Sequence, residues 1–358
     1  MNNLGVIQVI DTLETGGAEV LAVNITNGLI EENVNSHICA TRKEGPLLNN
    51  LKDKSNYIFL NRKKIIDFNA LVIFKKYLKK NNISIIHAHA TSYFFVFLIK
   101  LISPKTKVIW HNHYGNNLSL KGFKLLILKI STYFFRSIIN VNKELNLWAI
   151  KKLCSKNVFY LMNFAFLGNK EKLTTLKGQQ DKRIVHLASF RPEKDHENLI
   201  MAFSHFVKNN KDWTLHLVGR IDKNEYSKKN MKLIKALGLE KHIFVYGTCF
   251  DIHNILSQAS IGVLSSKSEG LPIAMLEYGL ASIPTIVTDV GECSNVIKNN
   301  ISGIVVKPNN YLELSEGFKI LANSEEKRKK FSEAFNINVE KNYSKESFFK
   351  ELINIYKI

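Results

Sequence analysis

The feature of the sequence that most constrains the fold is a regular alternation of short apolar runs with longer amphipathic segments. In the first half of the chain, the apolar runs cover residues 5–11, 36–41, 57–60, 83–89, 108–111 and 137–141. In the second half, they cover residues 184–189, 214–218, 243–246, 261–264, 284–288 and 303–306. Strand-like runs that alternate with helical patterns predict parallel sheets with helices on both faces.

The alternation is interrupted once, by a polar stretch over residues 166–183, which we interpret as a linker. A chain of 358 residues is long enough for two domains that each bury a core. The apolar face of a final helix must also pack against a domain, although the sequence itself does not indicate which one. We assign four segments: an N-terminal Rossmann-like domain (1–165), the linker (166–183), a second domain (184–340) and a C-terminal helix that crosses back to the first domain (341–358).

The net charge of +19 is unevenly distributed. Residues 1–168 contain 22 lysines and arginines against 9 acidic residues, and the segment between Arg62 and Lys143 contains 15 basic residues and one acid, Asp67. This imbalance favours an anionic partner for the first half. No nucleic-acid recognition motif is present, so we do not expect nucleic acid to be that partner.

Residues 118–139 interleave four basic side chains with leucine, isoleucine and phenylalanine. A basic helix that carries aromatic residues is typical of segments that lie on an anionic membrane surface. The alternative is a core-packed helix with a solvated lysine edge. The chain shows no secretory signal and no apolar stretch long enough to span a bilayer, and its four cysteines are scattered. We therefore expect a cytoplasmic protein with reduced thiols.

The stretch over residues 265–277 has the pattern of a ligand-binding junction. A short strand leads into serines and Gly270, and Pro272 suits the start of a helix. The backbone N–H groups at such a helix start favour a phosphate. Glu269 and Glu277 would repel a phosphate, so they are better suited to accept hydrogen bonds from sugar hydroxyls. Together these features indicate a nucleotide sugar.

Glu269 and Glu277, with Gly270, Leu271 and Pro272 between them, resemble the E-x7-E motif of the retaining family-4 glycosyltransferases. The resemblance covers nearly the whole chain, and its further motifs are Gly16-Gly17-Ala18-Glu19, Pro192-Glu193-Lys194, Val218-Gly219, Thr288-Asp289-Val290-Gly291 and Ser302-Gly303. It implies the GT-B fold, an α/β architecture in which two Rossmann-like, doubly wound domains face a central cleft.

The resemblance implies a metal-independent, retaining hexosyltransferase without a cofactor. Its donor would be a nucleotide-diphosphate sugar, with UDP expected in preference to GDP, and its acceptor a hydroxyl of a glycan or lipid-linked molecule. The product would be a surface polysaccharide, such as capsule or the O-antigen of lipopolysaccharide. Because lipid-linked acceptors are common in the family, we expect the protein at the inner face of the plasma membrane.

The resemblance also assigns roles to residues of the second domain. Lys194 would pair with the donor diphosphate, Glu269 would contact the donor sugar, and Glu277 would hold the ribose hydroxyls. The remaining donor-binding candidates form glycine turns or strand ends: Gly16, Gly17, Gly219, Arg220, Ser268, Gly270, Leu271 and Pro272.

One position departs from the family pattern. Many members carry an arginine five positions before the lysine, where this chain has Ser189. Arg191 can supply the missing guanidinium, or it can be an exposed loop arginine; Arg220 is a second candidate. The departure also motivates an alternative hypothesis, in which the protein is a degenerate glycosyltransferase that only binds a partner. A further alternative is another GT-B enzyme, such as a nucleotide-sugar epimerase.

Two histidine pairs, His87 with His89 and His111 with His113, follow neighbouring strand predictions. Four imidazoles can bind a metal, but no carboxylate accompanies them and the chain has no DxD motif, so we expect no metal. At least two of the four are expected to be structural. The family resemblance implies a functional histidine after the strand that ends at His111, and the sequence leaves His111 and His113 both open.

Overall fold

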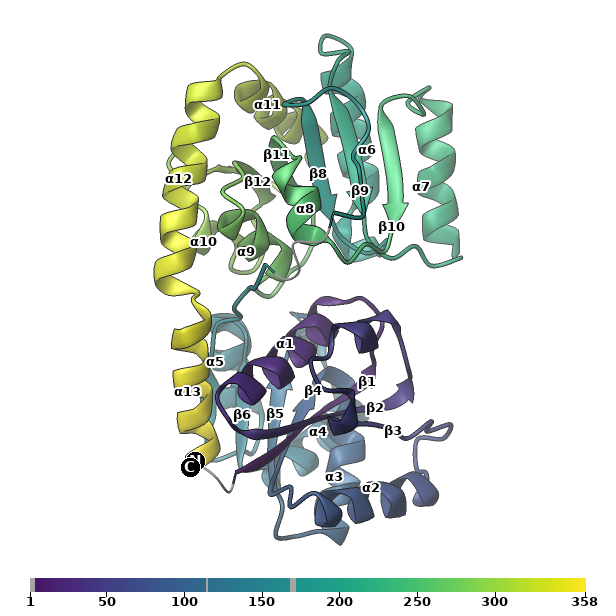
Figure 1. The fold of residues 1–358 in the computed structure, drawn as a ribbon, viewed down its shortest axis with the longest axis vertical. Coiled ribbons are helices and arrows are strands. Elements are labelled where there is room, and N and C mark those ends of the chain that lie inside the picture. Colours follow the sequence, from purple (N-terminus) through teal and green to yellow (C-terminus); the bar gives the residue numbers. More distant parts are fainter. Residues whose placement is uncertain (1–3, 114, 168–171) are drawn as a thin grey trace. The chain divides into compact units, whose positions relative to one another are not determined.

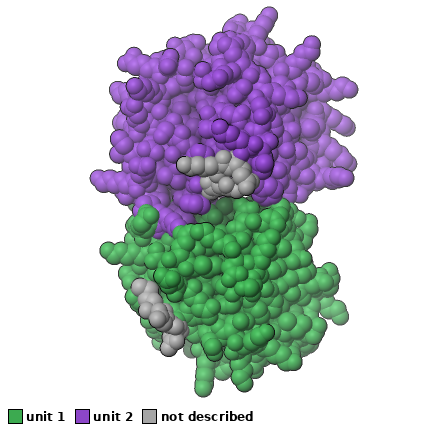
Figure 2. All heavy atoms as spheres, viewed as in Figure 1, with its two compact units in different colours: residues 1–163, 346–358 green, residues 164–345 purple. Residues whose placement is uncertain are grey.

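The computed structural model describes residues 4–113, 115–167 and 172–358. The chain forms two compact units (Figure 2): unit 1 contains Met1–Asn163 and Glu346–Ile358, and unit 2 contains Phe164–Lys345. The described parts of the predicted linker, residues 166–167 and 172–183, belong to unit 2. There the carboxylate of Asp251 accepts hydrogen bonds from the backbone N–H groups of Leu173 and Thr174, at 2.9 and 2.6 Å.

Unit 1 is built on a seven-stranded parallel sheet in the order β3-β2-β1-β4-β5-β6-β7 (Figure 1). Its strands are β1 (Gly5–Thr12), β2 (Asn35–Lys43), β3 (Tyr57–Phe59), β4 (Ile85–His89), β5 (Lys107–Asn112), β6 (Ser137–Asn140) and β7 (Val158–Tyr160). Its helices are α1 (Gly17–Glu31), α2 (Phe68–Lys80), α3 (Tyr93–Ile102), α4 (Gly122–Tyr133), α5 (Lys143–Lys152) and α13 (Lys345–Lys357), with short 3₁₀ turns η1 (Pro46–Asn50), η2 (Lys54–Asn56), η3 (Ala90–Ser92) and η4 (Gly115–Ser119).

The two faces of this sheet differ in chemistry because side chains alternate along each strand. On one face, apolar residues of β1, β4 and β5 pack with α2, α3 and α4 in a single core cluster that includes Val9, Ala88 and Trp110. The intervening positions point to the other face, and there Gln8 and three histidines are buried. The strands therefore present one apolar face and one face with a polar stripe.

Helix α13 returns to unit 1 from the far end of the chain (Figure 1). It buries Phe348, Phe349, Leu352, Ile353, Ile355 and Tyr356. Phe349 lies against Gly28 of α1, where a Cβ atom would come within 2.1 Å of the phenyl ring. The hydroxyl of Tyr356 reaches the polar stripe of the sheet, so α13 contributes to the interior of unit 1.

Unit 2 has a six-stranded parallel sheet in the order β10-β9-β8-β11-β12-β13. Its strands are β8 (Arg183–Leu187), β9 (Thr214–Val218), β10 (Ile243–Gly247), β11 (Ile261–Leu264), β12 (Thr285–Thr288) and β13 (Ile304–Val306). Its helices are α6 (His196–Val207), α7 (Glu225–Ala236), α8 (Ile252–Ser257), α9 (Ile273–Leu280), α10 (Cys293–Val296), α11 (Tyr311–Ala322) and α12 (Glu325–Asn342), preceded by η5 (Pro192–Lys194).

The prediction of two Rossmann-like parallel sheets is confirmed. The predicted helix over residues 118–139 overlaps the predicted strand over residues 137–141, and the structure separates the two: α4 covers Gly122–Tyr133, and Ser137 already belongs to β6. The helix prediction is therefore wrong in extent, whereas the strand prediction is confirmed. In the part of the chain that the structure describes, no helix has the length and apolar character needed to cross a bilayer.

Candidate functional site

The strand order of unit 2 places a switch point between β8 and β11, which are neighbours in the sheet although three helices separate them in sequence. Ligands of open parallel sheets bind beyond the carboxyl ends of the strands at such a point. The loops that leave β8 and β11 lie there together: the backbone N–H of Lys267 donates to the carbonyl of Glu193 at 2.8 Å. The hydroxyl of Ser265 donates to the carbonyl of Lys194 at 2.9 Å.

Lys194 and Glu269 form an ion pair across these two loops. The ammonium Nζ of Lys194 lies 2.6 Å from Oε1 of Glu269, and the same oxygen accepts a hydrogen bond of 2.6 Å from the hydroxyl of Ser266. The Glu269 side chain is 8% exposed and that of Lys194 23%. The arrangement brings a cation to the switch point and holds a carboxylate beside it.

The loop between Lys194 and α6 has an unfavourable backbone conformation. Asp195 has φ of 52°, in the left-handed region, where a side chain with a Cβ atom is disfavoured. Its buried carboxylate forms an ion pair with Lys267 at 2.9 Å, between Oδ1 and Nζ. Asp195 and Lys267 thereby connect the β8 loop to the β11 loop by a second ion pair, which the sequence did not predict.

A third loop, which follows β12, packs against the backbone of Glu269. Gly291 has φ of 56°, and a Cβ atom there would come within 2.3 Å of the carbonyl oxygen of Glu269 and 2.5 Å of that of Gly270. The next residue, Glu292, donates its backbone N–H to the carbonyl of Gly270 at 2.9 Å. Only glycine fits this approach, so the motif residue Gly291 determines where Glu269 lies.

Helix α9 begins directly after the loop, with Pro272 as its N-cap residue, and the side chain of Pro272 makes no capping hydrogen bond. Ser268, Gly270 and Leu271 therefore immediately precede a helix N-terminus, as predicted. Glu277 lies in α9, and burial raises its pKa from the ordinary value of 4.5 to about 7. Near neutral pH this carboxyl group can act both as a hydrogen-bond donor and as an acceptor.

The remaining candidates of unit 2 surround the end of β8. Gly219, after β9, has φ of 155°, and a Cβ atom there would come within 2.1 Å of the carbonyl oxygen of Ala188. Arg220 forms an ion pair with Asp222 at 3.1 Å. Arg191 is partly exposed, and its guanidinium makes no hydrogen bond or ion pair with the described residues. Arg191 is therefore the more available of the two arginines.

The other sequence candidates lie in unit 1. Its sheet has a switch point between β1 and β4, and the Gly16-Gly17 turn follows β1. A Cβ atom at Gly16 would come within 2.3 Å of the Glu19 carboxylate, whereas no described atom lies within 4 Å of the corresponding position at Gly17. Unit 1 thus carries the glycine turn and the histidines, and unit 2 carries Lys194, Arg191, both glutamates and the α9 junction.

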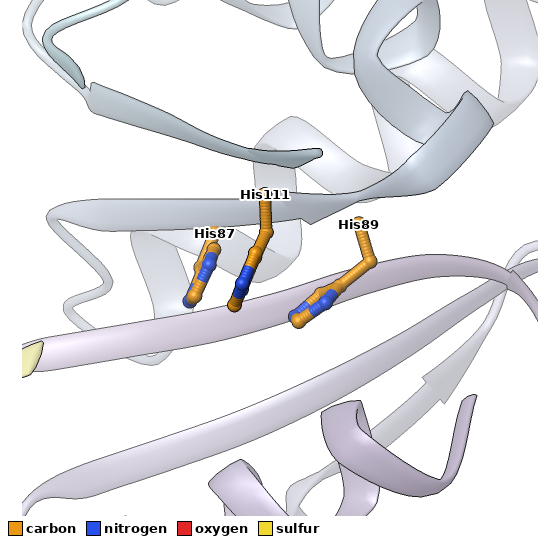
Figure 3. A group of neighbouring side chains, drawn as sticks. All are labelled: His87, His89 and His111. Atoms are coloured by element: carbon orange, nitrogen blue, oxygen red, sulfur yellow. The ribbon is translucent and has the colours of Figure 1, made fainter. Parts of the chain in front are cut away.

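His87 and His89 of β4 and His111 of β5 point to the same side of the sheet (Figure 3). All three are buried, and one ring nitrogen from each lies within 4.8 Å of the others, a spacing that can hold a metal ion. The ring planes of His87 and His111 are nearly parallel, however, at 6° with centroids 5.2 Å apart. Nitrogen lone pairs lie in the ring plane, so stacked imidazoles do not direct them at one point.

Burial governs the protonation of this cluster. It lowers the pKa of His87 to about 3 and holds the pKa values of His89 and His111 well below their ordinary value, with further lowering from the neighbouring imidazoles. His113 is partly exposed at the end of β5, and desolvation lowers its pKa to about 3. All four imidazoles are therefore neutral at physiological pH.

The residues that hydrogen-bond to the histidines were not predicted from the sequence. Gln8 accepts a hydrogen bond from His89, and Tyr356 contacts both Gln8 and His87. Gln8 is a polar residue within an otherwise apolar stretch of β1, and this pattern could have identified it as a candidate. Tyr356 lies 348 positions away in the chain, and no local pattern connects it to Gln8.

Comparison with known proteins identifies the class. A family profile described as glycosyl transferases group 1 matches residues 169–336, and one described as glycosyltransferase family 4 matches residues 15–151. The chain belongs to the glycosyltransferases of these families.

Among its relatives, the O-antigen biosynthesis glycosyltransferase WbnH of Escherichia coli is 26% identical over 319 residues, covering 86% of each chain. The Escherichia coli UDP-Gal:alpha-D-GlcNAc-diphosphoundecaprenol alpha-1,3-galactosyltransferase is 24% identical, covering 75% of each.

Two solved structures show the same fold. HepE from Anabaena, in complex with UDP-glucose, aligns with a TM-score of 0.81 at 15% identity, over 98% of each chain. A glycosyltransferase from Rickettsia africae aligns with a TM-score of 0.78 at 19% identity, over 100% of this chain and 98% of that one. The predicted GT-B fold class is confirmed.

Proposed function

We propose that this glycosyltransferase moves a hexose from a UDP-sugar to a hydroxyl of a glycan or lipid-linked acceptor, with retention and without a metal, in the synthesis of a surface polysaccharide. The observation that carries the proposal is the Lys194–Glu269 pair at the switch point of unit 2, beside the start of α9. UDP is favoured over GDP because HepE binds UDP-glucose and the second relative above is named for UDP-Gal.

In the proposed reaction, the bond between the anomeric carbon and the diphosphate oxygen breaks, and the acceptor oxygen bonds to the same face of that carbon. The acceptor proton passes to the departing diphosphate. Lys194, the backbone N–H groups at the start of α9 and the unpaired guanidinium of Arg191 stabilise the negative charge that develops there. In this proposal, Arg191 supplies the positive charge that many family members carry on an arginine at the position of Ser189.

The two glutamates act by orientation in this proposal. Glu269 is already positioned by Lys194 and Ser266, and it accepts hydrogen bonds from the donor sugar. Glu277 holds the ribose hydroxyls from within α9. Neither residue needs to transfer a proton.

Between the two histidine candidates, we propose that His113 contacts the reacting sugar. His111 is fully buried, and neither of its ring nitrogens has a hydrogen-bond partner among the described residues. His113 is partly exposed at the carboxyl end of β5, the edge at which parallel sheets bind ligands.

Two measurements test this function. Thermal unfolding with UDP, GDP, ADP and CMP should show the largest stabilisation with UDP, because a ligand that binds only the folded state raises its stability. NMR of the product should show the same anomeric configuration as the donor. An inverted product would refute the retaining reaction, and equal stabilisation by all four nucleotides would refute the choice of UDP.

We also propose that unit 1 binds an anionic membrane surface, and two helices support this. Helix α4 buries Leu128 together with Ser131 and Thr132, while Phe123 and Tyr133 are 75% and 69% exposed. This orientation does not fit a helix that packs its apolar face into the core. The exposed positions that repeat along one side of α4 are Phe123, Leu126, Ile130 and Tyr133.

Helix α2 adds a second apolar surface on the same face of the sheet, since α2, α3 and α4 share one core cluster. Phe68 at its start is 77% exposed, and Ile65 just before it is 67% exposed. Exposed lysines accompany these side chains at positions 63, 64, 75, 76, 121 and 124. Large apolar side chains among basic residues are suited to a bilayer interface with anionic lipids.

Sedimentation with lipid vesicles tests the membrane proposal. The protein should bind vesicles that contain phosphatidylglycerol at low salt and be released at high salt. Phe123→Asp with Leu126→Asp should weaken binding by about tenfold or more, since the apolar contact is lost. The matched control is Ile337→Asp, at an exposed position of α12 in unit 2. Equal recovery with neutral and anionic vesicles would refute the proposal.

A further inference from the structure

A chain of hydrogen bonds runs through the interior of unit 1 from Tyr356 to His113. The side-chain amide of Gln8 donates from Nε2 to the hydroxyl of Tyr356 at 3.3 Å. Its Oε1 lies 2.8 Å from Nε2 of His89, and Nδ1 of His89 lies 3.0 Å from Nε2 of His113. Gln8 and His89 are completely buried, Tyr356 is 1% exposed, and His113 alone is partly exposed.

The direction of each hydrogen bond from Gln8 to His113 follows from the amide oxygen of Gln8. An amide oxygen only accepts, so His89 must carry its proton on Nε2 and donate it to Gln8. A neutral imidazole has one proton, which leaves Nδ1 of His89 as an acceptor. His113 must then donate from Nε2 to fill that acceptor. The lone pair of His113 is consequently on Nδ1.

We propose that Gln8 and His89 are positioning residues that hold His113 in the tautomer with its proton on Nε2 and a bare Nδ1. Such a nitrogen is an acceptor for a sugar hydroxyl. The importance of that acceptor for catalysis rests on the proposed function, whereas the tautomer itself does not.

Burial supports a fixed tautomer rather than a titrating group. The low pKa values of His89 and His113 exclude a second ring proton near neutral pH, so each imidazole has one donor and one acceptor. In the buried interior of unit 1, an unmatched donor or acceptor costs about 1–3 kcal/mol, which favours the arrangement in which Gln8, His89 and His113 are bonded to one another.

Tyr356 is the hydrogen-bond partner of the Gln8 amide nitrogen. Its oxygen accepts from Gln8 and lies 2.7 Å from Nδ1 of His87, to which its O–H can donate. In the structure, the amide nitrogen of Gln8 faces Tyr356 and the amide oxygen faces His89. A residue of the C-terminal helix is thereby connected through hydrogen bonds to a residue at the end of β5.

The test is NMR of the full-length protein labelled with ¹⁵N in its eleven histidines. Protonated and bare ring nitrogens have widely separated ¹⁵N shifts, and the His113 signals are those lost in His113→Gln. The expected spectrum shows a protonated Nε2 and an unprotonated Nδ1 for His113 between pH 6 and 8. A proton on Nδ1, or averaged shifts from both tautomers, would overturn the proposal.

Two variants test the cause. Gln8→Met removes the acceptor for His89, and Tyr356→Phe removes the hydroxyl that accepts from the Gln8 amide nitrogen. Each should convert the His113 signals to those of a mixture. Tyr278→Phe is the matched control, because it deletes a buried tyrosine hydroxyl in unit 2, which is bonded to Leu187, and should leave His113 unchanged.

Thermal unfolding establishes that each variant is folded. Unchanged His113 shifts in folded Gln8→Met or Tyr356→Phe would show that these residues do not set the tautomer, and a change in the Tyr278→Phe control would show that the effect is unspecific. If Gln8→Met does not fold, the spectra of Tyr356→Phe and of the wild type still test the proposed tautomer. A protein with the expected spectrum but without sugar transfer would refute the proposed function and leave the tautomer assignment intact.

Discussion

At the scale of single residues, the candidate donor site depends on charges placed in a partly buried environment. Glu269 is almost fully buried and is compensated by Lys194 and Ser266. Such a carboxylate is costly to leave unpaired, so the pair both stabilises the loop and keeps a cation at the switch point. A diphosphate that engages Lys194 would join an already ordered cluster.

The raised pKa of Glu277 predicts that the free energy of unfolding depends on pH. Its pKa of about 7 in the folded protein lies above the ordinary value of 4.5, so the folded state favours the protonated form. The stabilising contribution is fully present below about pH 4.5 and is lost as the pH rises through 7. Glu277→Gln cannot ionise, so its free energy of unfolding relative to the wild type should increase by about 3 kcal/mol between these pH values.

Denaturant unfolding at a series of pH values measures this difference. The matched control is Glu225→Gln, at an exposed carboxylate in the first turn of α7, whose difference from the wild type should change little with pH. A constant difference for Glu277→Gln across the range would show that Glu277 ionises normally.

The sequence placed Lys194, Glu269 and Glu277 at strand–loop–helix junctions because these residues lie within local motifs. It could not predict the Lys194–Glu269 pair, since 75 positions separate the two residues and only the order of β8 and β11 brings them together. The contacts of His113 were unpredictable for the same reason, because its partners lie on β4 and, through Gln8, on β1 and α13.

At the scale of elements, three loops at the carboxyl ends of β8, β11 and β12 form one assembly in unit 2. The β8 loop is bonded to the β11 loop through Glu193 and Lys267, and the β12 loop reaches the β11 loop through Glu292. Gly291 allows the closest of these approaches. The sequence predicted each of these strands, but not that a glycine after β12 would position a glutamate after β11.

Gly291→Ala should therefore be more destabilising than a glycine change that alters backbone conformation alone. Gly238 is the matched control: its φ is 66°, and no described atom lies within 4 Å of where its Cβ atom would be. We expect a loss of about 1 kcal/mol for Gly238→Ala and about 3 kcal/mol for Gly291→Ala, with weaker stabilisation by UDP in the second variant only. Equal losses in the two variants would contradict the steric argument.

At the scale of the whole molecule, unit 1 combines segments that are far apart in the sequence. The C-terminal residues, 346–358, belong to the same unit as the first strand. The apolar face of α13 was evident in the sequence, and the packing of Phe349 against Gly28 shows what that face covers. The core of unit 1 therefore includes side chains of a helix that lies more than 180 positions beyond Asn163 in the sequence.

Phe349→Ala measures how much α13 stabilises unit 1. The side chain is 2% exposed, and its truncation should reduce the free energy of unfolding by about 3–5 kcal/mol, because a cavity is left beside α1. Ile337→Ala, at a position that is 65% exposed, should change stability by less than about 0.5 kcal/mol. A loss below about 1 kcal/mol for Phe349→Ala would mean that α13 contributes little to the unit.

The most direct test of the central claim is release of nucleoside diphosphate from UDP-, GDP- and ADP-sugars by the wild type and by Lys194→Met. The wild type should release UDP from at least one UDP-sugar, and Lys194→Met should lower kcat by about 100-fold or more, because a group that stabilises the departing diphosphate is lost. Lys182→Met, at an exposed ion pair with Asp212, is the matched control and should retain full activity. A folded Lys194→Met variant with wild-type kcat would contradict the account, as would a wild-type protein that releases no nucleoside diphosphate from any of these donors.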